Sequence, residues 1–147
     1  MAALSSYFGL PDHDGLLPKW LLFVGSVATL NAFQAYRSPL YTARVYLGTK
    51  SHLNPESTVP SVGALGSRAF GTWTLTSGII RFIAAYNLEN PVAYQLAFAS
   101  YIIALAHFGS EWFYYGTAKM GPGILGPLII SSSTLVWMWL QWDYYVT

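Results

Sequence analysis

Two long stretches of the chain, residues 20–36 and residues 120–142, contain no charged side chain. A bilayer core about 30 Å thick requires about 20 predominantly apolar residues per helix. Only 9% of the 147 residues are charged and 54% are apolar or aromatic, whereas soluble domains carry about 25% charged residues. Because so few charges could not keep this much apolar surface in water, the sequence predicts a membrane protein.

Four segments are predicted to cross the membrane: residues 16–36, 69–87, 91–115 and 124–142. The second segment is the least apolar, because it contains Arg81 and several hydroxyl side chains. We still expect it to span, since an arginine near a helix end can reach the lipid headgroups. The predicted fold is one all-α domain, a small antiparallel bundle of four transmembrane helices.

The connections between these segments agree with such a bundle. Residues 1–15 form a polar tail, and residues 37–67 form the one long connection. The link between the second and third segments is short enough for a tight hairpin, with Asn90 as the N-cap and Pro91 as the first helical residue.

Basic residues predict the orientation of the bundle. Lys19, with Arg81 reaching outward, lies on the side of the termini, and five basic residues lie on the opposite side: Arg37, Arg44, Lys50, Arg68 and Lys119. Because loops rich in Lys and Arg stay in the cytosol, we expect residues 37–67 to be cytosolic and both termini to be lumenal.

A group of polar residues is expected at one depth, near the cytosolic ends of the helices. Its members are Asn31, Gln34, Arg68, His107 and Glu111. In the predicted hairpin of the second and third segments, Glu111 lies opposite Arg68, whereas Arg81 lies opposite Ala97, where there is no acidic residue. Ionisable groups inside membrane spans are costly and usually have a function. We assign this cluster a structural or partner-binding role.

Small and polar residues also recur at helical spacing on the second and third segments. On the second segment they are Gly71, Thr74, Gly78 and Arg81, and on the third they are Ala97, Ser100 and Ala104. Small residues on one face allow membrane helices to approach closely. We therefore expect these two stripes to pack against each other.

Several functional classes are disfavoured by counts and spacing. The net charge of +1 gives no footprint for nucleic acid, and the absence of cysteine removes thiolate chemistry and cysteine metal sites. His107 and Glu111 stand one helical turn apart, as metal ligands often do, but only two other histidines exist. Residues 121–126 match Gly-x-Gly-x-x-Gly without the strand that a dinucleotide site needs. No catalytic, cofactor-binding or metal-ligating residue is predicted.

Several short strings resemble the ergosterol biosynthetic protein 28 family, and most closely its fungal members. The most specific string is Arg68–Leu75, which reads Arg-Ala-Phe-Gly-Thr-Trp-Thr-Leu. The other strings are Leu17–Leu22, Ile80–Arg81, His107–Glu111, Gly126–Leu128 and Leu135–Met138. The likeness extends in order from about residue 17 to residue 145. Departures are Ala69, where Thr is common, and a longer connection over residues 37–67.

The resemblance implies a non-catalytic scaffold of the endoplasmic reticulum membrane. Such proteins tether the sterol C-4 demethylation enzymes: the C-4 methyl oxidase, the C-3 sterol dehydrogenase that acts as the C-4 decarboxylase, and the 3-keto sterol reductase. The implied partners also include membrane lipid, with sterol and a second copy of the chain as further candidates. The family has no catalytic residues to carry over to this chain.

Two other functions remain as alternatives. The first is a small membrane isomerase or reductase that uses His107 and Glu111 as acid–base groups on a sterol. The second is a sterol carrier whose ligand lies between aromatic-rich helices, with walls that include Trp73, Phe82, Tyr101 and Phe108. Turnover of a sterol by the purified protein would indicate the enzyme, and saturable binding without partners would indicate the carrier.

Overall fold

The computed structural model describes residues 9, 11, 13–46, 62–118 and 120–146, and this part of the chain is helical without any strand. Its six helices are α2 (Leu17–Arg37), α3 (Pro39–Ala43), α4 (Ala64–Ala85), α5 (Pro91–Phe113), α6 (Pro122–Leu140) and α7 (Trp142–Tyr145). The prediction of an all-α fold is therefore confirmed for the described residues.

Proline and polar caps set where several helices begin. The carboxamide of Asn90 accepts hydrogen bonds from the backbone N–H groups of Val92 and Ala93, at 2.9 and 3.3 Å, and Pro91 is the first residue of α5. The predicted cap and hairpin are thus confirmed. Ser38 caps α3 in the same way, and Gly121 and Pro122 open α6. Proline suits these positions because its missing N–H would have no partner in the first turn.

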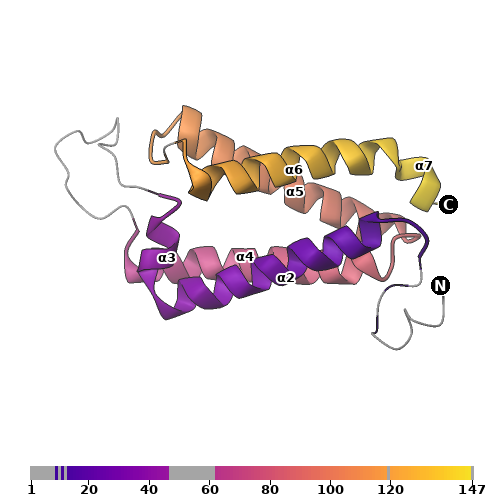
Figure 1. Cartoon of the computed structure of the whole chain (residues 1–147), viewed down its shortest axis with the longest axis horizontal. Coiled ribbons are helices and arrows are strands. Elements are labelled where there is room, and N and C mark those ends of the chain that lie inside the picture. The colour runs from indigo at the N-terminus through magenta and orange to yellow at the C-terminus, as the bar shows by residue number, and fades with distance from the viewer. Residues whose placement is uncertain (1–8, 10, 12, 47–61, 119, 147) are drawn as a thin grey trace.

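The long helices form two antiparallel pairs, α2 with α4 and α5 with α6 (Figure 1). The pairs lie close together where α2 begins, and this end also carries α7 and the turn between α4 and α5. The opposite end carries α3 and the turn between α5 and α6. The start of α2 and the end of α6 therefore lie at the opposite end of the molecule from α3, as an even number of antiparallel helices requires.

The observed helices differ from the predicted segments at some boundaries. α4 begins at Ala64, before the predicted start at residue 69, because no proline or cap interrupts the run after Gly63. The predicted connection over residues 37–67 contains the short helix α3, which the Ser38-Pro39 start makes favourable. Residues 47–61 of that connection and residues 1–8, 10 and 12 of the predicted tail lie outside the described residues.

Two of the described helices, α5 and α6, are long and apolar enough to cross a membrane. α2 and α4 have 21 and 22 residues, which is sufficient length, but they are less apolar than α5 and α6. The reason lies in their polar side chains, such as Asn31 and Gln34 in α2 and the threonines of α4. By length and apolarity, the structure thus supports the third and fourth of the four predicted spans.

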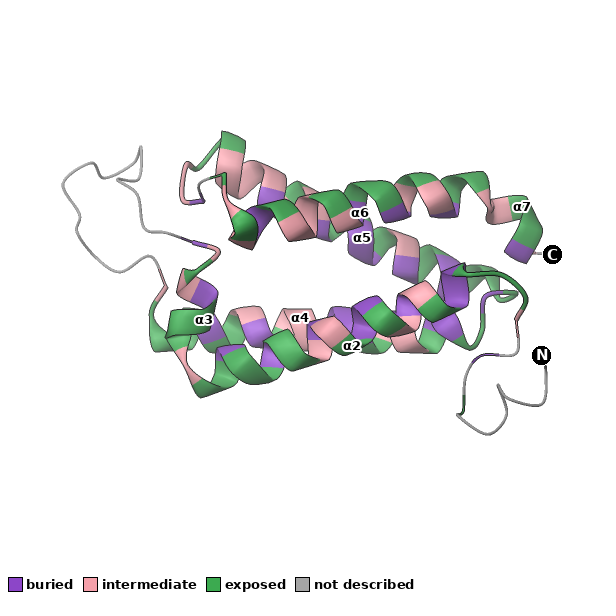
Figure 2. Ribbon diagram, viewed as in Figure 1, coloured by how far each residue is buried: buried purple, intermediate pink, exposed green. Residues whose placement is uncertain are grey.

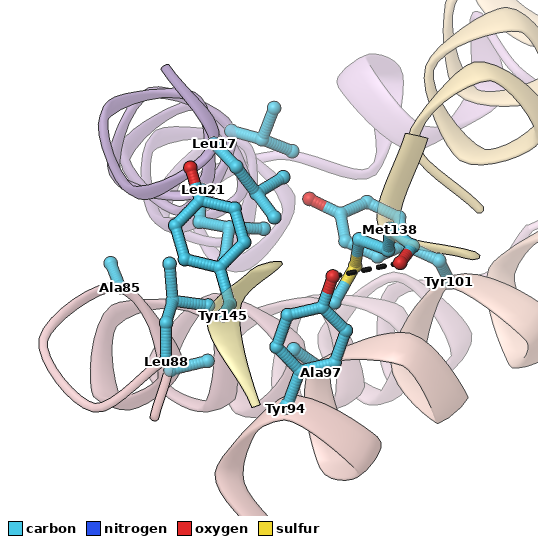
Figure 3. Close-up of a cluster of buried hydrophobic side chains, with 11 residues drawn as sticks. Leu17, Leu21, Ala85, Leu88, Tyr94, Ala97, Tyr101, Met138 and Tyr145 are labelled. Carbon is cyan, nitrogen blue, oxygen red and sulfur yellow. Dashed lines mark hydrogen bonds between the residues drawn. The ribbon is translucent and has the colours of Figure 1, made fainter. Parts of the chain in front are cut away.

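The main core joins all four long helices at the end that carries α7. It contains Leu17 and Leu21 from α2, Ala85 from α4, Tyr94, Ala97 and Tyr101 from α5, and Met138 from α6, with Leu88 and Tyr145 beside them (Figure 3). The Tyr94 hydroxyl donates a 2.8 Å hydrogen bond to the carbonyl of Met138. Buried residues face inward between the helix pairs, and exposed residues cover the outward faces (Figure 2).

Candidate functional site

A cavity of about 440 Å³ lies between the two helix pairs. All four long helices contribute to its wall, together with the segment from Tyr41 to Val45. Much of the wall is apolar: Val24, Val27, Ala28, Phe70, Trp73, Ala104, Phe108 and Ile130. Its volume falls in the range of about 300–1,000 Å³ that small-molecule sites occupy. The cavity is therefore the candidate functional site.

Arg81 is the unusual residue of this cavity. Its side chain lines the wall and is 7% exposed, and its guanidinium carbon lies 4.1 Å from the centre of the Tyr101 ring. Nε has no hydrogen-bond partner among the described residues. The face of the stacked ring stabilises such a desolvated cation by about 2 kcal/mol.

Within the described part of the chain, no acidic side chain lies against Arg81. Across the described residues, the one ion pair joins His13 and Glu89, 2.7 Å apart at the end of the bundle. Hydroxyl groups near Arg81 are engaged by their own helices: Ser77 donates to the carbonyl of Trp73 at 3.0 Å, and Thr74 to that of Phe70 at 2.7 Å. The guanidinium is therefore a donor-rich cation in a mainly apolar cavity.

The predicted polar cluster is distributed over three places in the structure. Asn31 and Gln34 are exposed residues of α2 that line the cavity. Arg68 is exposed in the second turn of α4, and the structure gives it no ion pair within the described residues. His107 and Glu111 lie near the end of α5, each with a partner other than Arg68.

His107 is held in an aromatic environment. Its Nε2 and the hydroxyl of Tyr46 form a hydrogen bond of 2.5 Å, and the rings of Tyr46, Trp73 and Phe108 surround the imidazole at centroid distances of 5.2–5.8 Å. Burial raises the pKa of the Tyr46 phenol above its usual value, and the nearby Glu111 carboxylate raises it further. Tyr46 therefore stays neutral and ties the segment after α3 to α5.

Glu111 is committed to the turn that follows α5. Its carboxylate accepts a hydrogen bond from the hydroxyl of Thr117, and its backbone carbonyl accepts the N–H groups of Thr117 and Ala118 at 3.0 and 3.2 Å. The predicted pairing of Glu111 with Arg68 is not formed. The reason is that the turn after α5 places the Thr117 hydroxyl against the Glu111 carboxylate.

The glycines of the predicted stripe pack against α2 instead of α5, which corrects the expected pairing. Gly78 lies against Gly25, Ala28 and Thr29, and Gly71 lies against Ala32 and Tyr36. The physical reason is that α2 carries its own row of small residues, so α2 and α4 approach backbone to backbone.

The remaining stripe residues lie between the two helix pairs. Thr74, Arg81 and Ala104 line the cavity. Ala97 belongs to the main core, and the buried Ser100 donates to the carbonyl of Ala97 at 2.7 Å.

The sequence placed Tyr101 in the wall of a possible ligand site but did not predict its contact with Arg81, and it gave no role to Tyr46. Tyr101 lies one turn after Ala97, on the same face as Ala104, so the helical spacing contained the signal for it. Tyr46 comes from the long connection, and no local pattern points from there to His107. The buried hydrogen bond of 2.8 Å between Thr42 and Ser67 was missed for the same reason.

Comparison with known proteins gives consistent matches over most of the chain. Residues 17–136 match the family described as Erg28 like protein. The chain is 48% identical to "Ergosterol biosynthetic protein 28" of Candida albicans over 134 residues, 91% of each protein. It is 45% identical to the protein of that name from Saccharomyces cerevisiae, over 89% of this chain and 83% of the relative.

A less similar relative still matches over most of the chain. The human "Ergosterol biosynthetic protein 28 homolog" is 33% identical over 84% of this chain and 82% of its own. No solved structure matches the chain significantly. The matched region contains α2 through most of α6, and with them every residue of the cavity wall. The chain therefore belongs to the Erg28 like protein family.

Proposed function

We propose that this protein acts in sterol biosynthesis as a non-catalytic scaffold of the endoplasmic reticulum membrane, with α2, α4, α5 and α6 as four transmembrane helices. The names of its relatives support the place in sterol biosynthesis, since they read "Ergosterol biosynthetic protein 28". Its partners would be the sterol C-4 methyl oxidase, the C-3 sterol dehydrogenase (C-4 decarboxylase) and the 3-keto sterol reductase.

The observation that carries the membrane part of this proposal is the surface of the four long helices. Large apolar side chains are exposed on each of them: Phe23, Leu30 and Phe33 on α2, Ile79 and Ile83 on α4, Leu96, Ile102 and Ile103 on α5, and Ile129, Val136 and Trp139 on α6. Apolar surface of this extent on a small domain marks contact with lipid or with a partner. α2 and α4 therefore face the same apolar surroundings as α5 and α6.

The hydrogen bonds of His107 and Glu111 favour a scaffold over the isomerase or reductase alternative. An acid–base catalyst must reach its substrate. His107 is instead bonded to Tyr46, and the Glu111 carboxylate to Thr117. Both groups thus strengthen contacts within the protein, between the end of α5 and the segments on either side of it.

The end of the bundle that carries α3 is the proposed cytosolic docking surface. Arg37, Arg44 and Arg68 are all exposed there, and Lys50 and Lys119, predicted on the same side, lie outside the described residues. Charged rims of this kind steer partners and set their orientation. Holding three enzymes together keeps poorly soluble intermediates at high local concentration, which is the benefit that a tether provides.

The test is affinity purification of the full chain from fungal membranes in mild detergent. The wild-type protein should recover all three enzymes. Arg68→Glu should lower their recovery by about tenfold, a loss that corresponds to about 1.4 kcal/mol. The control is Lys19→Glu near the start of α2, at the opposite end of the bundle, which should recover the enzymes normally. Recovery of none of the enzymes with the wild type would refute the scaffold, and normal recovery with Arg68→Glu would remove that surface from it.

A further inference from the structure

The strongest unexplained feature of the molecule is the guanidinium of Arg81 in the central cavity. It is 7% exposed, its Nε is unpartnered among the described residues, and its contact is the face of the Tyr101 ring. A buried charge requires a charged or hydrogen-bonding partner. We propose that the cavity binds a lipid-like monocarboxylate, whose carboxylate pairs with Arg81 and whose apolar body lies along the remaining wall.

Charge and wall composition both define this ligand. Arg81 is the buried cation of the wall, whereas Arg44, which also lines the cavity, is exposed. A single negative charge therefore balances the buried cation. A guanidinium matches a carboxylate through two parallel hydrogen bonds. The rest of the wall offers apolar surface, with Trp73, Ala104 and Phe108 on one side and Val24 and Ile130 on the other. The ligand therefore has one acidic end and a long apolar body.

The arrangement of the helices leaves a route into the cavity. α2 and α6 both line it, yet the two helices make little contact with each other. The contacts between them lie near the start of α2, where the Trp20 indole donates a 2.9 Å hydrogen bond to Thr134 and its ring centre lies 6.4 Å from that of Trp137. Asn31 and Gln34, farther along α2, are exposed and also line the cavity. A ligand would thus enter between α2 and α6, from the side that faces the surrounding lipid.

This inference is independent of the scaffold role, because it concerns the protein alone. The test uses the purified full chain in lipid nanodiscs and two tritiated acids, oleate and cholanic acid, each compared with its primary alcohol. We expect saturable one-to-one binding of at least one acid, with the alcohol binding at least tenfold more weakly. Oleate alone would identify a straight-chain occupant, cholanic acid alone a fused-ring occupant, and both acids recognition of the head group.

Substitutions locate the site. Arg81→Met keeps an unbranched side chain but removes the charge, and it should weaken acid binding at least tenfold while leaving alcohol binding unchanged. Lys19→Met removes an exposed cation far from the cavity and should bind both acids as the wild type does. If Arg81→Met does not fold, Ala104→Phe fills the cavity while keeping the cation, and should also weaken binding of the acids.

Ala99→Phe is the matched control for the cavity-filling variant, because Ala99 is exposed on the outer face of α5. It should bind the acids normally. The proposal is overturned if neither acid binds saturably, if the alcohols bind as tightly as the acids, or if Arg81→Met keeps full affinity. Equal binding by Ala104→Phe and Ala99→Phe would likewise overturn it, because the ligand would then lie outside the cavity.

Discussion

At the scale of single residues, two glycines determine how closely α2 and α4 approach. A Cβ atom added at Gly78 would lie 3.1 Å from the carbonyl oxygen of Gly25, and one added at Gly25 would lie 3.2 Å from the carbonyl oxygen of Gly78. Each glycine thus faces the backbone of the other helix. Contact of this kind stabilises membrane helix pairs through van der Waals packing.

Gly78→Leu should therefore separate α2 from α4. Overpacking of a tight interface costs about 1–3 kcal/mol, which should appear as a lower midpoint in unfolding of the purified protein by a denaturing detergent. Gly109→Leu is the control, since a Cβ at Gly109 in α5 meets no atom within 4 Å. Equal loss of stability in the two variants would contradict the role of the Gly25–Gly78 contact.

The Tyr46–His107 hydrogen bond gives a second prediction at this scale. Tyr46→Phe keeps the ring contacts with Phe70 and His107 but removes the hydroxyl that bonds Nε2. Because this leaves a partly buried imidazole without that partner, stability should fall by about 1–3 kcal/mol. Tyr36→Phe removes an exposed hydroxyl bonded to Thr72 and should cost much less in the same unfolding assay. A larger effect at Tyr36 would refute this account.

At the scale of helices, a charged substitution on the outward face of α5 tests whether that face contacts lipid or water. Ile103 is 60% exposed near the middle of α5, so Ile103→Arg would be harmless in a soluble protein. In lipid it should shift the insertion free energy of the α5 segment by about 2.5–3.5 kcal/mol. The measurement is the inserted fraction of the segment between two glycosylation acceptor sites of a reporter protein.

Tyr114→Arg serves as the control, because Tyr114 is the C-cap of α5 and its side chain is exposed. An arginine there can reach the headgroups, so the inserted fraction should change little. If Ile103→Arg inserts as well as Tyr114→Arg, the outward face of α5 is not in contact with the lipid interior.

The positions of the long helices could be predicted from the sequence, whereas their pairing could not. Proline and Asn90 mark where α5 begins, and such local signals need no knowledge of the rest of the chain. Pairing depends on the faces of two helices at once. The small residues of α4 were matched to α5, but Gly25, Ala28 and Ala32 gave α2 an equally suitable face.

The candidate site could be predicted only in part, for a related reason. Arg81 was recognisable as a costly residue without an acid opposite, and the structure places it over Tyr101, one turn beyond the Ala97 position expected across the hairpin. A long arginine side chain covers that difference. The cavity itself arises from the way two helix pairs diverge, which no single segment encodes.

At the scale of the whole molecule, the antiparallel arrangement predicts which helix ends lie on the same side of the membrane. If all four long helices cross it, α3 and the turn between α5 and α6 lie on one side, and the start of α2 and the turn between α4 and α5 lie on the other. If only α5 and α6 cross, both ends of α2 lie on the same side. The absence of native cysteine allows single-cysteine variants to separate these arrangements.

The most direct measurement is labelling of four single-cysteine variants in sealed microsomes with a maleimide that cannot cross the membrane. Leu16→Cys, Leu40→Cys, Asn87→Cys and Met120→Cys replace exposed residues at the ends of the helices. The four-helix account predicts that Leu40→Cys and Met120→Cys react at once, whereas Leu16→Cys and Asn87→Cys react only after the membrane is permeabilised. Identical accessibility of the cysteines at positions 16 and 40 would contradict it.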